Sequence, residues 1–401
     1  MAFPEVYLSK PAIVLPSDRL DNDEVIRRIR ANFTGDEAKW PIIEAGIKRV
    51  FEVSNSQYRY LEPDISVRVA DFALRAVNEV LAETKVDAKD LDMVISGGIA
   101  REYFEPATAM EITGKLGLDP IHAFDVTSAC LGQLEGIQIV AAFFSMREDF
   151  DTALVCSGEL TRGFLAYDIQ DPKELIYKLA GLTIGNAAAA WVMRRTPFEG
   201  GCLRLLTGQT MSLPTHWHLC STPIDGSFTS FSSDLFKLNV HVAPEIKRCI
   251  EKVGWTPDEV DHYVFHQPSK SMVDKVLSDL GVPMDRGTHT FHLYANTAST
   301  TVPIAMHQTL IERNRSSHAI SSHVFSCIFY DLICNDKRSL IMPITPAEDV
   351  LLADFNPVPN DSCLTFLCDS GELGVLVQFL CGTITFTRNS RQSFTLFYYH
   401  L

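Results

Sequence analysis

An internal repeat runs through the chain as far as about residue 315. Residues 86–98 and 255–267 each read as an acidic turn followed by a short apolar run, which is typical of a buried strand. An amphipathic helical pattern precedes each of them, and a proline and a second helix ending at Leu-Gly follow. The order helix, strand, helix, strand, central helix therefore occurs twice, offset by about 165–170 residues. Duplication explains four matching elements in the same order better than chance likeness of two common βα units.

The repeat predicts the fold class. Alternating helices and apolar strands favour an α/β architecture whose sheets are covered on both faces. A chain of 401 residues is long enough for two core-forming halves. We expect the first half at residues 1–200 and the second at 201–315.

Charge and composition exclude several classes of protein. The chain has 35 Lys and Arg against 50 Asp and Glu, a net charge of −15, which argues against non-specific nucleic-acid binding. We expect no secretory signal and no membrane span, because the first residues lack a basic and apolar leader and the apolar runs are short. Its ten cysteines show no CxxC pair, so we expect mostly reduced thiols and a cytoplasmic location.

Three polar residues fall at strand-to-helix corners of the repeat, where α/β proteins build their sites. Cys130 opens an apolar helix, Asn296 occupies a nearly equivalent place in the second half, and His266 ends an apolar strand. A helix N-terminus favours the nucleophilic thiolate of a cysteine, and an imidazole and a carboxamide can donate hydrogen bonds to an oxyanion. Taken singly, each could be structural: a buried thiol, a core histidine, a turn asparagine. Together they favour a catalytic site.

The motifs around these residues resemble those of a known family. DVTSACLG surrounds Cys130, VFHQPSK surrounds His266 and YANTAST surrounds Asn296, while GLTIGNAAAAWVM (181–193) is similar to the small-residue segment that closes the family's first half. The chain resembles the thiolase-fold condensing enzymes, specifically the β-ketoacyl-ACP synthase III branch, over roughly residues 5–315. The resemblance implies a thiolase-like fold of two duplicated βα halves in a layered α/β/α/β/α sandwich, and a homodimer.

The resemblance also implies a reaction. Cys130 would take an acyl group from a CoA or acyl carrier protein thioester. His266 and Asn296 would hold the carbonyl of a malonyl donor during decarboxylation, and the carbanion would attack the acyl-cysteine. The product would be a β-ketoacyl thioester in fatty acid, related lipid or polyketide biosynthesis. This chemistry requires no metal and no redox cofactor.

A finer resemblance involves REYFEPATA (101–109), which is similar to a segment of the head-to-head acyl-CoA condensing enzymes of olefin biosynthesis. In that group a glutamate reaches in from the dimer partner as a base, and Glu105 is the matching residue. The alternative interpretation of Glu105 is that it is a solvated carboxylate at the start of a helix, without a catalytic role. Acyl transfer or thioester hydrolysis, and a catalytically impaired homologue serving as a dimer partner, stay open as further functions.

Other polar residues are weaker candidates. A possible metal site is formed by His216, His218 and Cys220, which are spaced two residues apart. This spacing places the three side chains on one face of a strand, so we favour a strand over a metal site. Lys270 and Lys275 could attract an acidic carrier protein, although charged helix faces are usually only solvated.

The resemblance stops after about Arg315, so we expect residues 316–401 to be a divergent tail. The family's second half closes with two strands and a glycine-rich loop, whose backbone N–H completes the acyl oxyanion hole. Residues 316–401 are rich in Cys and Phe and contain no sequence similar to that glycine-rich loop. The tail is either a diverged or inserted segment, or the product of a misassigned reading frame or intron; the weak periodicity favours the second.

Overall fold

The computed structural model describes residues 5–199, 201–223 and 228–315, together with the backbone of five strands beyond them. The chain divides into two compact units, Met1–Asp336 and Lys337–Leu401. Both halves of the repeat lie in the first unit.

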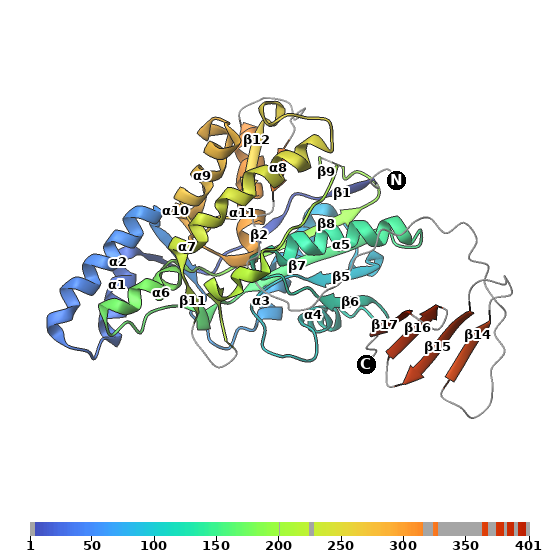
Figure 1. Cartoon of the computed structure of the whole chain (residues 1–401), viewed down its shortest axis with the longest axis horizontal. Helices are drawn as coiled ribbons and strands as arrows, with labels where there is room; N and C mark the ends of the chain where they lie inside the picture. Colours follow the sequence, from blue (N-terminus) through green and yellow to red (C-terminus); the bar gives the residue numbers. More distant parts are fainter. Residues whose placement is uncertain are drawn as a thin grey trace. The chain divides into compact units, whose positions relative to one another are not determined.

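A mixed sheet forms the framework of the first half (Figure 1). Its strand order is β6-β5-β7-β8-β1-β9, with β2 also paired to β8. The strands β6, β5 and β7 are parallel, whereas β8 runs antiparallel to β7. Their bounds are β1 (Val6–Leu8), β2 (Ala12–Val14), β5 (Met93–Ser96), β6 (His122–Asp125), β7 (Thr152–Glu159), β8 (Ala187–Arg194) and β9 (Leu203–Leu205).

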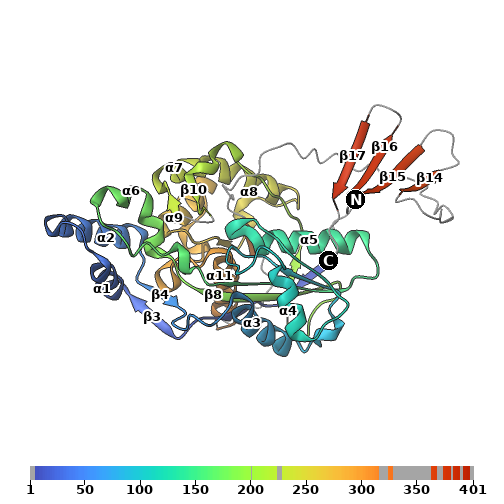
Figure 2. The same ribbon diagram turned by 90° about the horizontal axis from the view of Figure 1, so that it is seen from below.

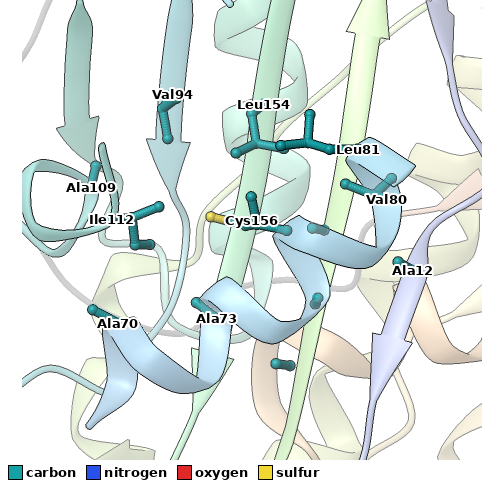
Figure 3. Packing of buried hydrophobic residues seen from close by; sticks show 14 of the residues in the cluster. Ala12, Ala70, Ala73, Val80, Leu81, Val94, Ala109, Ile112, Leu154 and Cys156 are labelled. Atoms are coloured by element: carbon teal, nitrogen blue, oxygen red, sulfur yellow. The ribbon is translucent and has the colours of Figure 1, made fainter. Parts of the chain in front are cut away.

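Helices α3 (Val69–Thr84) and α4 (Thr108–Leu116) cover one face of this sheet. Figure 3 shows Ala73 of α3 near Cys156 of β7, and Leu81 at the other end of the helix next to Leu154. A Cβ added to Gly158 of β7 would lie 2.8 Å from the backbone nitrogen of Ala73. Small residues allow the helix to approach closely, and alternate residues of each strand face it because side chains alternate across a sheet.

The other face of the sheet packs against two central helices, α5 (Gly132–Met146) and α11 (Thr301–Arg315). Beyond them lies a second sheet, in which β12 (His262–Phe265) pairs in parallel with β13 (Val324–Cys327). Val264 of β12 faces the central helices, whereas Tyr263 and Phe265 face α8 (Val242–Glu251) and α9 (Lys270–Leu280). The five layers confirm the predicted α/β/α/β/α sandwich (Figure 1).

Within the described residues, the window Ala129–Met146 is apolar enough and long enough to cross a membrane by composition. It consists of α5 and the turn before it, and its buried side chains pack in the core between the two sheets. Such a match is typical of a central core helix.

Equivalent elements of the two halves are separated by a constant number of residues. Strand β12 begins and ends 169 positions after β5, at 262 and 265 against 93 and 96. The central helices show the same offset, 301 and 315 against 132 and 146, and so do the 3₁₀ turns that precede them, η3 (Ala129–Leu131) and η11 (Ala298–Thr300). The predicted duplication is therefore present in these elements. The second strand expected in the second half is wrong, because residues 291–294 form a short helix, α10 (Phe291–Tyr294), where the first half has β6.

A cluster of elements flanks the first unit's layers, at the left of Figure 1 and again beside α6 in Figure 2. Its apolar core joins α1 and α2 to residues from the segment between β7 and β8. The bounds are β3 (Asp18–Asp21), α1 (Asn22–Asn32), α2 (Trp40–Ser54), β4 (Tyr58–Leu61) and α6 (Leu175–Lys178).

The second unit is an antiparallel meander of four strands, β14 (Cys363–Leu367), β15 (Gly374–Leu380), β16 (Thr383–Arg388) and β17 (Gln392–Phe397). The segments between these strands, and most of residues 316–362, lie outside the described residues. So does the place where the family's glycine-rich loop is expected. The origin of the tail stays a prediction.

Candidate active site

Cys130 lies in the 3₁₀ turn η3, directly before α5. The residue before it, Ala129, has a φ of 40°, a left-handed conformation that an alanine rarely adopts. Such strain is typical of functional corners. The start of α5 is held against the loop after β5 by two glycines: a Cβ added to Gly97 would lie 2.3 Å from the carbonyl oxygen of Gly132. Backbone therefore packs directly on backbone beneath the nucleophile candidate.

The second half has the same corner, with a different residue in it. Ala298 has a φ of 52° and opens η11, just as Ala129 opens η3. At the 169-residue offset the counterpart of Cys130 is Ser299, not Asn296. The expectation that Asn296 is nearly equivalent to Cys130 is therefore corrected by three positions, because the 169-residue offset holds from β12 through η11.

The Asn296 backbone is fixed on both sides. Its N–H donates to the Thr183 carbonyl at 2.8 Å, and its own carbonyl accepts from Gly185 N–H at 2.9 Å. Its side-chain Oδ1 accepts from the N–H of Ala298 at 3.0 Å. Because the oxygen is occupied, Nδ2 is the end of the carboxamide that can donate to a ligand.

His266 follows β12 and is 8 % exposed. Its Nδ1 lies 2.5 Å from Oγ1 of Thr301, the first residue of α11. Burial lowers the pKa of His266 to about 4, so the imidazole is neutral at pH 7. With Nδ1 engaged, Nε2 is the nitrogen available to a ligand.

The supports of these three residues converge. η11 follows Asn296, leads into the Thr301 that binds His266, and contacts η3, which contains Cys130. The sequence places the three residues at separate corners, and the structure brings those corners together at the N-terminal ends of the two central helices. A nucleophile, a neutral imidazole and a carboxamide N–H are the groups that acyl transfer needs.

Glu105 is exposed, on a loop between β5 and α4, whereas Cys130 and Asn296 are half-buried and His266 is buried. The loop spans residues 97–107, whereas its counterpart between β12 and α9 spans only 266–269. It is anchored where Arg101 donates to Thr127 Oγ1 at 2.6 Å and where Glu102 accepts the N–H of Val69 at 2.7 Å. Beyond these anchors, Phe104 is 78 % exposed.

Comparison with known proteins agrees with this geometry. Residues 250–319 match the family described as "3-Oxoacyl-[acyl-carrier-protein (ACP)] synthase III C terminal". An acyl-CoA:acyl-CoA alkyltransferase of Xanthomonas campestris pv. campestris is 29% identical over 255 residues, which are 61% of this chain and 74% of the relative. A β-ketoacyl-[acyl-carrier-protein] synthase III of Symbiobacterium thermophilum is 28% identical over 259 residues, 61% of this chain and 75% of the relative.

Solved structures show the same fold. A glutamate-to-alanine variant of Xanthomonas campestris OleA has a TM-score of 0.72 at 24% identity, covering 83% of this chain and 97% of that chain. A cysteine-to-serine variant, with bound lauric acid and lauroyl-CoA, has a TM-score of 0.67 at 25% identity, covering 78% and 92%. The chain has the thiolase fold, and its sequence is similar to the condensing enzymes of the β-ketoacyl-ACP synthase III family. The resemblance inferred from the motifs is confirmed.

One buried residue of this condensing enzyme escaped the sequence analysis. Glu159 ends β7 and is fully buried, at the strand end nearest η11. The sequence does contain a signal for it, because Glu159 is the single charged residue of the run TALVCSGE (152–159). A carboxylate in a fully buried strand is costly, which marks such a position as one with a specific partner.

Two weaker candidates are placed differently by the structure. His216 and His218 lie in a 3₁₀ helix, Pro214–Leu219, so the expected strand is wrong there. The proline at the first helical position favours the helix. Lys270 and Lys275 both lie on α9, and each forms an ion pair with the aspartate four residues further on. This pairing reduces the positive charge that α9 presents to an acidic carrier protein.

Proposed function

We propose that this condensing enzyme is an acyltransferase that forms a carbon–carbon bond by Claisen condensation. Cys130 attacks the carbonyl of an acyl thioester, forms an acyl-cysteine and releases the thiol of CoA or of a carrier protein. A second thioester then supplies a carbanion, by losing CO₂ from a malonyl group or a proton from an acyl chain. The carbanion attacks the acyl-cysteine, and the Cys130 thiolate leaves as the β-ketoacyl product forms.

The convergence of three corners carries this proposal. Cys130, His266 and Asn296 come from separate elements, and all three are supported by η3, η11 and the start of α11. In the proposed reaction the Asn296 amide nitrogen and the His266 Nε2 face the thioester of the second substrate. The neutral imidazole suits a site where charge develops on the substrate rather than on the enzyme. The reaction needs its two thioester substrates and no further cofactor.

Head-to-head condensation of two acyl-CoAs is the second candidate, and the loop at 97–107 favours it. The loop is longer than its counterpart in the second half and presents Glu105 and the apolar Phe104 on the surface. A second copy of the chain could cover Phe104 and receive Glu105 as the base that removes the acyl proton. Homodimerisation is part of this proposal. The bound lauroyl-CoA of the Xanthomonas relative supports an acyl-CoA donor.

Intact-protein mass after mixing with a panel of acyl-CoAs tests the first step. We expect one acyl adduct on the wild-type chain and none on Cys130→Ala. Adducts on both proteins would exclude Cys130 as the nucleophile. Absence of an adduct with every acyl-CoA and every acyl-carrier protein would contradict the proposed function.

A second assay separates the two condensations. The acylated enzyme is offered either malonyl carrier protein or a second acyl-CoA, and the β-keto products are identified by mass. Glu105→Gln should abolish only the product from two acyl-CoAs, because malonyl decarboxylation generates its carbanion without a base. If only free acid appears, hydrolysis is the reaction.

A further inference from the structure

Glu159 is a fully buried carboxylate that the proposed chemistry does not use. Its Oε1 accepts the N–H of Ile99 at 3.1 Å, and its Oε2 accepts the N–H of Ala100 at 3.2 Å. Oε1 also accepts both the N–H and the Oγ–H of Ser299, at 3.3 and 2.5 Å. Burial raises the pKa of Glu159, and these four bonds oppose the rise. Both oxygens are therefore used as acceptors, as an ionised carboxylate allows.

These bonds join the two halves of the repeat. Ile99 and Ala100 lie in the loop after β5, in the first half, whereas Ser299 is the central residue of η11, in the second. The Oγ of Ser299 also lies 2.8 Å from that of Ser157, so two residues of β7 hold the same serine. Ser299, the counterpart of the candidate nucleophile Cys130, thus fixes η11 to the first half.

The anchored turn supports two candidate catalytic residues. The N–H of Ala298, next to Ser299, holds Oδ1 of Asn296. Thr301, two residues after Ser299, holds the imidazole of His266. A shift of η11 would therefore move both groups at once.

The nucleophile has a different support. Cys130 lies beside the close packing of Gly97 on Gly132, which Glu159 does not touch. Glu159 contacts this loop only further along, at Ile99 and Ala100, whereas it binds Ser299 of η11 directly. Weakening the Glu159 contacts should thus disturb the turn beneath Asn296 and His266 more than the turn that contains Cys130.

We propose that Glu159 is a positioning residue for the condensation step, which locks η11 so that Asn296 and His266 are placed against the second thioester. The inference rests on the proposed function, since it assigns Glu159 to one of that reaction's two half-reactions. It requires that acylation of Cys130 and condensation respond differently to the loss of the carboxylate.

The test is Glu159→Gln, assayed for both half-reactions. Glutamine keeps the volume but has one acceptor oxygen, so its NH₂ meets either the N–H of Ala100 or the donors of Ser299. We expect acylation within about threefold of wild type, and condensation reduced about 100-fold, as misplacement by about 1 Å does. Ser299→Ala retains the backbone N–H bond, so its loss in condensation should be smaller.

Asp92→Asn is the matched control. Asp92 accepts the N–H groups of Asp151 and Thr152 at 2.7 and 2.9 Å, at the opposite end of the same strand β7. Asp92 directly precedes β5, so the substitution makes the same carboxylate-to-amide change at a residue that holds the other end of β7. We expect both half-reactions of Asp92→Asn to stay within about threefold of wild type.

The outcomes are distinct. If Glu159→Gln condenses at the wild-type rate, or loses acylation and condensation in parallel, the inference is overturned while the proposed function stands. If the wild-type chain itself forms no acyl adduct, the proposed function fails and the inference falls with it. Thermal unfolding is measured for each variant, and if Glu159→Gln does not fold, Ser299→Ala decides by the same comparison.

Discussion

The contact between Gly97 and Gly132 makes a sharp prediction about an alanine at the start of α5. Gly132 has helical angles, with φ −48° and ψ −43°, so its backbone suits any residue. By helix propensity alone, Gly132→Ala would stabilise the protein by about 1 kcal/mol. Steric contact predicts destabilisation instead, because the new Cβ would lie 2.6 Å from the carbonyl carbon and oxygen of Gly97.

The magnitude follows from that distance. Carbon atoms in ordinary contact are about 3.5–4.0 Å apart, so the two backbones must separate by about 1 Å. Overpacking of this kind costs about 1–3 kcal/mol of unfolding free energy. Cys130 lies two residues before Gly132, and a displacement of about 1 Å typically costs about 100-fold in rate. We expect both losses together.

The assay compares Gly132→Ala with Gly114→Ala. Gly114 lies within α4, where an added Cβ has no atom within 4 Å. Gly114→Ala should stabilise by about 0.5–1 kcal/mol and leave acylation unchanged. Denaturant unfolding gives the free energies, and the rate of acyl-adduct formation gives the activity. A Gly132→Ala variant as stable and as rapidly acylated as wild type would refute the close-packing argument.

Two further predictions concern His266. Its pKa is lowered from 6.5 to about 4, so the unfolded chain binds the proton more tightly, and stability falls as the pH drops through this window. The loss from this group is about 3 kcal/mol between pH 7 and pH 4, and His266→Gln should lack it in urea titrations at both pH values; equal pH slopes for the two proteins would contradict the burial of a neutral imidazole. Thr301→Val removes the oxygen that binds His266 Nδ1 and should slow condensation about 10- to 100-fold, whereas Thr301→Ser, which keeps the hydroxyl, should stay within about threefold. Equal rates for the valine and serine variants would show that the hydroxyl is dispensable.

The layered fold was predictable because its signals are local. Apolar strands such as HYVF (262–265), proline at helix starts and glycine after helix ends recur in both halves. The duplication then places the corners next to each other, because equivalent elements pack as a pair. Cys130, His266 and Asn296 were found at these corners for the same reason.

The remaining features depend on contacts between distant residues. The pairing of Glu159 with Ser299 spans 140 positions, and no periodicity connects them. Alternation at His216 and His218 indicated a strand, but the proline at 214 starts a 3₁₀ helix instead.

The Glu159 contact also bears on the order in which the chain folds during synthesis. Strand β7 and the loop after β5 belong to the first half, which leaves the ribosome before η11 exists. Until the second half packs against the first, the carboxylate of Glu159 has no hydrogen bond from Ser299 and is hydrated. Formation of this contact must therefore remove a hydrated charge from water while it supplies the serine donors, and contacts of such long sequence separation form slowly. The appearance of condensing activity would then report that final docking, and not the earlier formation of either sheet.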